Sequence, residues 1–527
     1  MTTASNKGGG LDYTDATTPK SPLDALESGV AQPDGALVYN SREVKALVGQ
    51  YIVIGLLYGV LPHFPLNILN DYYDLSSSNY NAPTGLVLLF GWSLKAFVGL
   101  LSDVVPIMGY RRKSYMLGGW VCCAVVLLVL ACLNHGSPSS DRYYRQDSKD
   151  IPVDPDFQAK GTRLGFLCAL ATFCYAFADV PADALAETIV YSVRSIGTMA
   201  SSLLIGLCLS SDRFRCDFSW DMGLNVWFFF LFAAVLFAIP VTFFYVKEAK
   251  KEAATVSSYV AQFRALLQTR GMWQLMAFNF IFSLLANSFP SVAPRYVQNL
   301  WGRVSSVDTM IMNVIGSAAF AATLAVVGKW GQTGNWRRWL VLTTLILNGV
   351  DAVCQFLSIY DILRNQIVFA IVPLAGEIPR AVQFILMMFT IVEVSDDGNQ
   401  GLVFGVLTTC STMAVPLGAA LSHALGGVFR LNDTRGSQNY IHGDNQIAYT
   451  YIIHYGLVCV AVCLVSLFPT QRTMLREWKK ASNDGSKSVG GWIFLAGAVL
   501  FVVAVIYNLM IVSDSVTCFR QAGGNGC

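Results

Sequence analysis

Two basic residues of this chain fall inside long apolar stretches, where a charge is costly. Lys95 lies in the apolar segment 85–101, and Arg380 lies in the apolar segment 367–392. Both segments are long enough to cross a lipid bilayer as helices. A charge inserted there costs about 3 kcal/mol unless it is paired or faces water. Such charges commonly mark the path of a solute or an ion, so both residues are candidates for a binding site.

Acidic residues in apolar stretches supply the opposite charge. Asp179 and Asp183 are four residues apart, so a helix places them on one face, and Lys95 can supply the cation that they need. Glu377 precedes Arg380 by three residues and can pair with it within one helix. The five residues form either structural ion pairs or the charged lining of a solute pathway, and both roles can coexist. The pathway is favoured for all except Asp183, which fits both roles equally.

The composition excludes a water-soluble globular protein. Of the 527 residues, 54% are hydrophobic and 13% are charged, and the mean hydropathy is +0.49. A soluble protein carries about 25% charged residues. The net charge of +2 gives no reason to expect a nucleic-acid partner. Neither a metal-ligand spacing nor a phosphate-binding loop occurs, so we expect no metal, no cofactor and no ATP-driven pumping. The apolar stretches lack a nucleophile–base set, so an enzyme is not expected.

The apolar stretches must be the elements that position these charges, because each is long enough to span a bilayer. A polar segment, 247–270, separates six of them from the next six, and one more follows. The sequence therefore predicts an all-α polytopic membrane protein, a 6+6 helix bundle with one extra C-terminal transmembrane helix. The spans lie near 47–69, 84–102, 114–133, 163–185, 190–210, 223–246, 272–292, 308–328, 339–359, 366–392, 401–427, 448–468 and 491–513.

The remaining segments complete this organisation. Residues 1–46 are polar and predict a disordered cytoplasmic tail. The six-helix halves occupy 47–246 and 271–468. The connector 247–270 has a helical composition, and a helix lying on the inner membrane face and a solvated linker helix fit it equally well. The last segments are a basic cytoplasmic loop (469–490), the extra helix (491–513) and a short tail (514–527).

The distribution of lysine and arginine predicts the orientation. More of them fall in the tail and in alternate loops than in the remaining segments, which places the N-terminus in the cytoplasm. Arg194, between the fourth and fifth spans, counts as an inner-loop residue in this scheme. Asn432 begins an Asn-Asp-Thr sequon in an outer loop and is a candidate glycosylation site. We expect a multi-pass protein of the plasma membrane that contacts lipid and functions as a monomer.

Equivalent places in the two halves carry similar residues. Asp179 lies two residues before Pro181 in the fourth span, and Glu377 lies two residues before Pro379 in the tenth. Proline bends a helix because it removes a backbone hydrogen bond. Bent helices at matching positions of two halves indicate where a solute binds. The alternative is a coincidence of common residue types.

A second correspondence involves the loops. Asp103 ends the second span and Arg111 and Arg112 open the third, while the loop after the eighth span carries Arg337 and Arg338. An acid and arginines at the inner edge can form a latch, or cytoplasmic gate, that closes the inner side. Retention of positive charge on the inner side accounts for part of the pattern without a gate.

The segment from residue 92 to residue 115 resembles the second-span signature of the folate-biopterin transporter family, within the major facilitator superfamily. Asp179 and the stretch 183–187 are similar to that family's fourth span, whereas Pro181 departs from it, so the substrate can depart as well. The matching residues of the signature are Trp92-Ser93-Leu94-Lys95, Gly99-Leu100-Leu101-Ser102-Asp103, Pro106 and Gly109-Tyr110-Arg111-Arg112-Lys113-Ser114-Tyr115.

The resemblance implies a major-facilitator-like fold and secondary transport of a folate- or pterin-like solute by alternating access. Asp179 or Glu377 can accept the paired donors of a pterin edge, and the carboxylates of folate suit Lys95 or Arg380. Proton coupling would rest on Asp179, Asp183 and Glu377, because removal from water favours a neutral carboxyl group. Two alternatives stay open: another metabolite such as S-adenosylmethionine as substrate, or a receptor of the same fold that does not transport.

Overall fold

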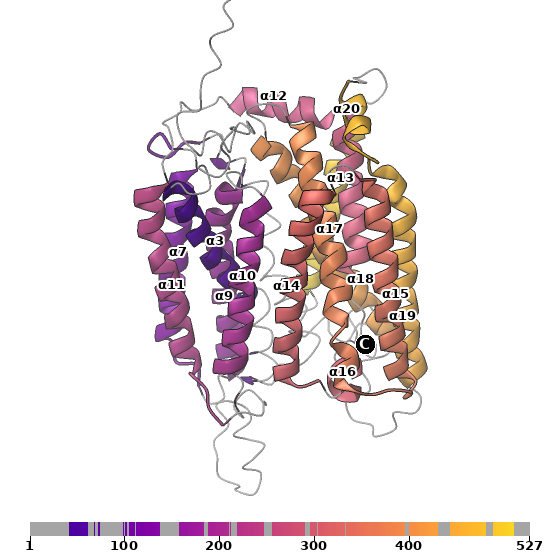
Figure 1. Cartoon of the computed structure of the whole chain (residues 1–527). Coiled ribbons are helices and arrows are strands. Elements are labelled where there is room, and N and C mark those ends of the chain that lie inside the picture. The colour runs from indigo at the N-terminus through magenta and orange to yellow at the C-terminus, as the bar shows by residue number, and fades with distance from the viewer. Residues whose placement is uncertain are drawn as a thin grey trace, which may run out of the picture.

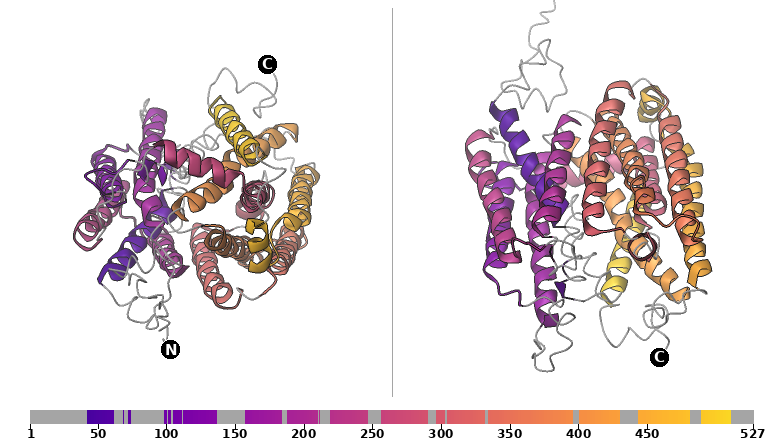
Figure 2. Two further views of the ribbon diagram at one scale, coloured as in Figure 1. Left: turned by 90° about the horizontal axis from the view of Figure 1, so that it is seen from above. Right: turned by 60° about the horizontal axis from the view of Figure 1, so that its bottom comes forward.

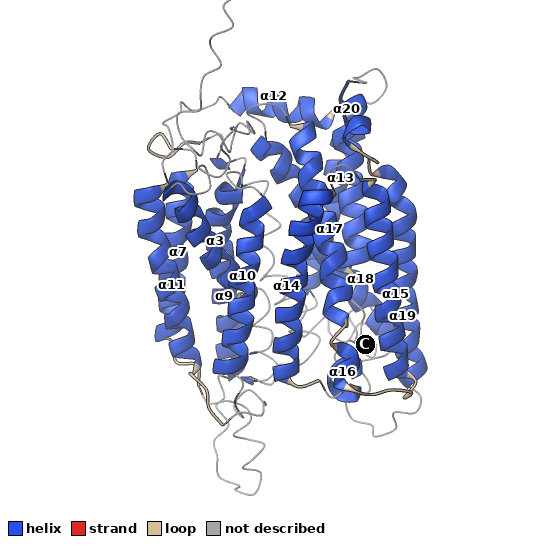
Figure 3. Cartoon of the chain, viewed as in Figure 1, coloured by secondary structure: helices blue, strands red, loops and turns tan. Residues whose placement is uncertain are grey.

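The computed structural model shows a helical protein (Figure 3). Helices make up the regular secondary structure of the residues that it describes, and no strand occurs among them. These residues are 42–61, 68, 72–73, 98–99, 101–102, 105–110, 112–136, 157–183, 188–209, 211, 219–246, 256–289, 296–302, 304–331, 334–395, 400–429, 443–480 and 489–510.

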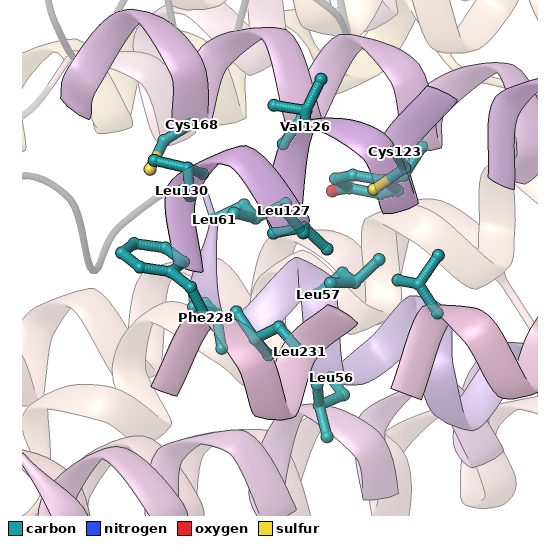
Figure 4. Packing of buried hydrophobic residues seen from close by; sticks show 14 of the residues in the cluster. Leu56, Leu57, Leu61, Cys123, Val126, Leu127, Leu130, Cys168, Phe228 and Leu231 are labelled. Atoms are coloured by element: carbon teal, nitrogen blue, oxygen red, sulfur yellow. The ribbon is translucent and has the colours of Figure 1, made fainter. Parts of the chain in front are cut away.

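Helices from the first half of the chain form one group (Figure 1). Their facing side chains pack into one apolar core, in which Leu57, Leu127, Leu130 and Phe228 come together from three different helices (Figure 4). Within a bilayer such packing stabilises by close van der Waals contact rather than by escape from water. The helices are α3 (Arg42–Val60), α7 (Lys113–Cys132), α9 (Phe157–Asp183), α10 (Thr188–Cys208) and α11 (Leu224–Tyr245).

Helices from the second half form a neighbouring group, and α10 of the first group packs against α14 of the second at the seam between them (Figure 1). The second group has its own apolar core. Its elements are α13 (Arg270–Phe282), η3 (Ser283–Ser288), η4 (Tyr296–Trp301), α14 (Ser306–Trp330), α15 (Trp336–Ile359), α16 (Gln366–Phe369), α17 (Val372–Val394), α18 (Gln400–Val428), α19 (Gly443–Cys463) and η7 (Leu464–Leu467).

Two short helices lie at one end of the bundle. Helix α12 (Val256–Leu267) lies across this end, and α20 (Arg472–Lys480) stands at the same end (Figures 1 and 2). Helix α12 falls within the connector 247–270, and α20 falls within the basic loop 469–490. The two segments that the charge distribution assigns to the inner face therefore share one end of the molecule.

The last helix, α21 (Val489–Met510), is docked onto the second half. Phe494 meets Phe263 of α12 edge to face, with ring centroids 5.5 Å apart. The side-chain amide of the buried Asn508 donates to the carbonyl oxygen of Pro416 in α18 at 3.1 Å. The extra helix thus contacts both the connector helix and the core of the second half.

Each helix of the described residues that is long and apolar enough to cross a membrane overlaps one of the predicted spans. Among the residues described, nine helices are long and apolar enough to do so. Helix α10 covers the predicted span near 190–210, whereas the span near 272–292 consists of α13 followed by the π-helix η3. Most of the span near 84–102 lies outside the described residues. The all-α, multi-pass architecture is therefore confirmed.

Small residues allow α3 and α10 to pack closely against each other in the first half. A Cβ atom at Gly55 would collide with the carbonyl oxygen of Arg194, and one at Gly197 would collide with that of Ile52. The hydroxyl of Thr198 donates to the carbonyl oxygen of Gly55 at 3.3 Å. Glycine is required here because the two backbones touch, as in small-residue helix pairs of membrane proteins.

This contact predicts a position-specific effect of adding one methyl group to α3. Gly55→Ala should lower the free energy of unfolding by about 1–3 kcal/mol, because the new methyl group overpacks the interface. Gly49→Ala in the same helix is the matched control, since no atom lies within 4 Å of a Cβ there. Thermal unfolding in detergent measures both variants. Equal unfolding temperatures would show that α3 and α10 do not touch at Gly55.

Candidate functional site

A buried carboxylate and a guanidinium face each other on adjacent helices of the first half. Asp179 lies near the end of α9 and is fully buried, and Nη1 of Arg194 in α10 lies 4.0 Å from its Oδ1. Arg194 is the seventh residue of α10, so it is part of a helix and not of a loop, as the charge distribution had suggested. The cation that faces Asp179 among the described residues is therefore Arg194.

Aromatic rings surround the Arg194 guanidinium. The ring of Tyr58 in α3 is 4.4 Å from the guanidinium carbon, and the ring of Tyr191 is 5.8 Å from it. A cation over an aromatic face is attracted by the ring quadrupole, and more strongly where water is excluded. The Arg194 side chain is 17% exposed, so these rings replace much of its hydration. Three helices, α3, α9 and α10, thus contribute to one charged site.

The same site adjoins the seam between the halves. Tyr191 belongs to α10, yet it is buried in the apolar core of the second half. Its ring packs edge to face against Phe384 of α17, with centroids 4.8 Å apart, and lies 6.2 Å from the ring of Tyr51. The aromatic contact between Tyr191 and Phe384 therefore joins the two halves one helical turn from Arg194.

The second half contains the ion pair that the sequence predicts on one helix. Nη1 of Arg380 lies 2.5 Å from Oε1 of Glu377, both in α17. The two side chains are 50% and 29% exposed, so this pair is far more accessible than Asp179. Glu377 packs against α14, where Gly316 leaves room for it: a Cβ there would lie 3.2 Å from Cγ of Glu377.

A polar contact that the sequence analysis did not predict joins α17 to η3. Gln383 is buried; its Nε2 donates to Oγ of Ser283 at 3.3 Å, and its Oε1 accepts from Nδ2 of Asn287 at 2.6 Å. Ser283 and Asn287 lie in η3, where the helix changes from α to π geometry. Irregular turns of this kind are frequent at functional sites. The sequence signal is a set of amide and hydroxyl residues inside apolar spans, which does not reveal their partners.

Another polar cluster lies between α15 and α19. Asp351 accepts hydrogen bonds from the hydroxyl of Tyr455 at 2.7 Å and from Gln355 at 3.2 Å. Nδ1 of the neighbouring His454 contacts the carbonyl oxygen of Phe289, directly after η3, at 2.9 Å. These contacts join elements within the second half.

Arginines at the end of the bundle that carries α20 join helices of the second half. Arg337, at the start of α15, donates to the carbonyl oxygens of Phe468 at 2.5 Å and Ser466 at 2.6 Å. Glu393, at the end of α17, pairs with Arg476 of α20 at 2.8 Å and with Arg472 at 3.4 Å. Glu393 and these two arginines therefore form an ion-pair cluster at the end of the bundle that carries α20. Its arginines come from α20 and not from the loop before α15.

Several predicted site residues have no described geometry. Asp183 is the last residue of α9, and its side chain is outside the described part of the chain. Arg112 directly precedes α7. The structure therefore brings together Glu377 with Arg380 and Asp179 with Arg194, and it leaves the predicted gate and the Lys95 contact as predictions. The residues outside the described ranges are Lys95, Asp103, Arg111 and Asn432.

Comparison with known proteins supports the resemblance in the first half. Residues 62–142 match the model of the BT1 family. The chain is 38% identical over 98 residues to a folate-biopterin transporter of Synechocystis sp., covering 18% of this chain and 19% of that protein. It is 35% identical over 91 residues to folate transporter 1 of Plasmodium falciparum, covering 16% and 17%. The matches span less than a fifth of the length of these curated relatives.

A solved structure identifies the fold over most of the chain. The crystal structure of a D-xylose–proton symporter superposes with a TM-score of 0.55, covering 81% of this chain and 97% of the symporter, at 12% identity. At that identity the likeness concerns the fold alone. The chain therefore shares the fold of this symporter, which agrees with the predicted helix bundle. The predicted resemblance to folate-biopterin transporters is confirmed over a short part of the chain by the BT1 family match and by the similarity to the Synechocystis sp. protein.

Proposed function

We propose that this protein is a secondary transporter that moves a folate- or pterin-like solute across a membrane by alternating access. The observation that carries the proposal is the buried pair of Asp179 and Arg194, placed beside the contact between two helical halves. Charges within membrane-spanning helices are costly and commonly mark solute pathways. The fold and the BT1 family match support the same function.

The chemistry of the site suits a flat, polar ring. Asp179 or Glu377 can accept the paired N–H donors along one edge of a pterin, since a carboxylate offers two acceptor oxygens. Tyr58 and Tyr191 offer ring faces and edges beside the charge. Lys95 and Arg380 are the proposed contacts for anionic groups, and Asp183 adds a further acid at the end of α9.

Equivalent acids in the two halves support a pathway between them. Pro181 lies inside α9 and Pro379 lies inside α17, each two residues after an acid. Alternating access requires the halves to separate at one end while they close at the other. In this structure Tyr191 and Phe384 are in contact, so this contact must break in the opposite state.

We place the end that carries α12 and α20 in the cytoplasm, with the N-terminus on that side and Asn432 outside. The basic residues of both segments support this orientation. In this proposal Asp103, Arg111 and Arg112 form a gate that closes the cytoplasmic side of the first half. The plasma membrane is the proposed location, and one chain suffices for transport.

Vesicles that contain the purified protein should show saturable uptake of labelled folate or biopterin. Asp179→Asn and Glu377→Gln should each lower the uptake rate at least about tenfold, a loss of about 1.4 kcal/mol, because the carboxylate that recognises the ring is lost. Asp361→Asn is the control: Asp361 is 71% exposed and has a φ of 57°, which asparagine tolerates. Saturable uptake of S-adenosylmethionine alone would contradict the substrate class, and binding without uptake would indicate a receptor.

An inward proton gradient should raise the initial rate of uptake. If a buried acid is protonated when the solute binds, proton movement and solute movement are coupled. A protonophore should therefore reduce the uptake rate to the level seen without a gradient. Each candidate acid is tested by its amide variant: Asp179→Asn, Asp183→Asn or Glu377→Gln. The acid that couples proton movement to transport is the one whose replacement removes the effect of the proton gradient on the uptake rate. An uptake rate that changes neither with the proton gradient nor with the protonophore would refute coupling through these residues.

A cross-link between the halves at Tyr191 and Phe384 should stop transport. The double variant Tyr191→Cys/Phe384→Cys, treated with a short bifunctional thiol reagent that reduction cleaves, should lose uptake and regain it on reduction. Each single variant and the unaltered chain, with its 13 native cysteines, receive the same reagent as controls. Full uptake by a cross-linked protein would mean that the halves do not separate at this contact.

A further inference from the structure

We infer that an amide cluster in the second half binds a neutral group of the solute that offers a hydrogen-bond donor beside an acceptor, such as the carbonyl edge of a pteridine ring. The inference rests on the proposed transport function and adds residues that the sequence analysis does not place in the site. The amide cluster consists of Asn279 in α13, Ser283 and Asn287 in η3, and Gln383 in α17. Hydrogen bonds already join the last three of these residues.

Asn279 is the member of the cluster whose hydrogen-bonding groups are unused. The side chain is fully buried, and neither its amide nitrogen nor its amide oxygen has a hydrogen-bond partner in the part of the chain that the structure describes. A buried amide that makes no hydrogen bond is costly, and native proteins seldom keep one. Its donors and its acceptor lie side by side, so a solute group with the complementary pair can satisfy both at once.

Asn279 lies on the helix face that carries the rest of the cluster. The backbone N–H of Ser283 donates to the carbonyl oxygen of Asn279, so the two residues are one turn apart and share a face. Asn287 follows about one turn further on, and its side chain is exposed. On α17, Gln383 comes three residues after Arg380, which is 50% exposed. The cluster therefore extends from accessible side chains to a buried amide that is free to bind.

The first half buries a matching amide. Gln50 is the ninth residue of α3 and is fully buried, and its two side-chain polar atoms also lack a partner among the described residues. Asn279 is the tenth residue of α13, and these two helices belong to the first predicted span of each half. Solute sites of transporters built from two similar halves lie between corresponding elements of the halves. The paired position of the two amides supports a ligand-binding role for Asn279.

A carboxamide and a carboxylate recognise different edges of a ring. A carboxylate only accepts hydrogen bonds, so Glu377 suits an edge with two N–H donors. The Asn279 carboxamide donates and accepts, as asparagine does when it pairs with a donor and an acceptor on one base edge of DNA. The ring of biopterin presents its amino group and a ring N–H along one edge and its carbonyl group beside that N–H. Glu377 and the amide cluster therefore suit neighbouring edges of one ring.

Replacement of Asn279 by leucine should weaken transport without destabilising the protein. Leucine has a similar size and leaves no unpaired polar group, so the unfolding temperature in detergent should stay the same or rise. The KM for biopterin uptake should rise at least tenfold. Asn348→Leu is the matched control and should keep the KM within twofold, because the Asn348 amide donates to the carbonyl oxygen of Thr344 in its own helix at 2.8 Å. An unchanged KM in Asn279→Leu, or a lower unfolding temperature, would overturn the inference.

A binding measurement separates this inference from the proposed function. Biopterin and an analogue that lacks the ring carbonyl oxygen are added to the purified protein, and thermal unfolding is followed. Biopterin should raise the unfolding temperature more than the analogue does, and Asn279→Leu should reduce that difference at least by half. Asn287→Ala should do the same, and it leaves no cavity because Asn287 is exposed.

The outcomes distinguish the two ideas. Preferential stabilisation by biopterin in a protein that shows no uptake would refute transport and keep the amide site. Equal stabilisation by biopterin and its analogue in the unaltered protein would refute the amide site, whatever the uptake assay shows. A difference that persists unchanged in both Asn279→Leu and Asn287→Ala would also refute it.

Discussion

The first half of this protein is organised around one carboxylate that is removed from water. Asp179 is fully buried, so its negative charge needs a nearby cation. Arg194 lies close enough to compensate that charge, on a helix whose backbone touches α3 at Gly55 and Gly197. The ring of Tyr58, also in α3, lies beside the guanidinium and replaces part of its hydration. The same close helix contact therefore brings the aromatic ring of α3 next to the charged pair.

The two halves compensate the charge of an acidic residue in different ways. In the first half the acid and its cation come from adjacent helices and are largely buried. In the second half Glu377 and Arg380 come from one helix and remain accessible. A pair within one helix keeps its geometry when helices shift, whereas a pair between helices changes with their spacing. The ion pair of the first half therefore depends on how its helices are packed, and the ion pair of the second half does not.

Sequence patterns were sufficient for the local features and insufficient for the contacts between helices. Apolar length predicted the spans, and a three-residue spacing predicted the Glu377–Arg380 pair, because both depend on one helix alone. Arg194 was assigned to a loop, since hydropathy does not fix where a span begins within several residues. The contact of its guanidinium with the Tyr58 ring and the contact of Tyr191 with Phe384 join residues far apart in the chain. Periodicity carries no information about such pairs.

The docking of α21 decides to which half the connector helix α12 belongs. Phe494 packs against Phe263, so the connector helix α12 is fastened to the last helix, and Asn508 fastens that helix to α18. Helix α12 is therefore packed with the second half, and it precedes all the other helices of that half in the chain. By its contacts, the connector helix belongs to the second half and not to the first, although the polar segment that contains it separates the two sets of spans.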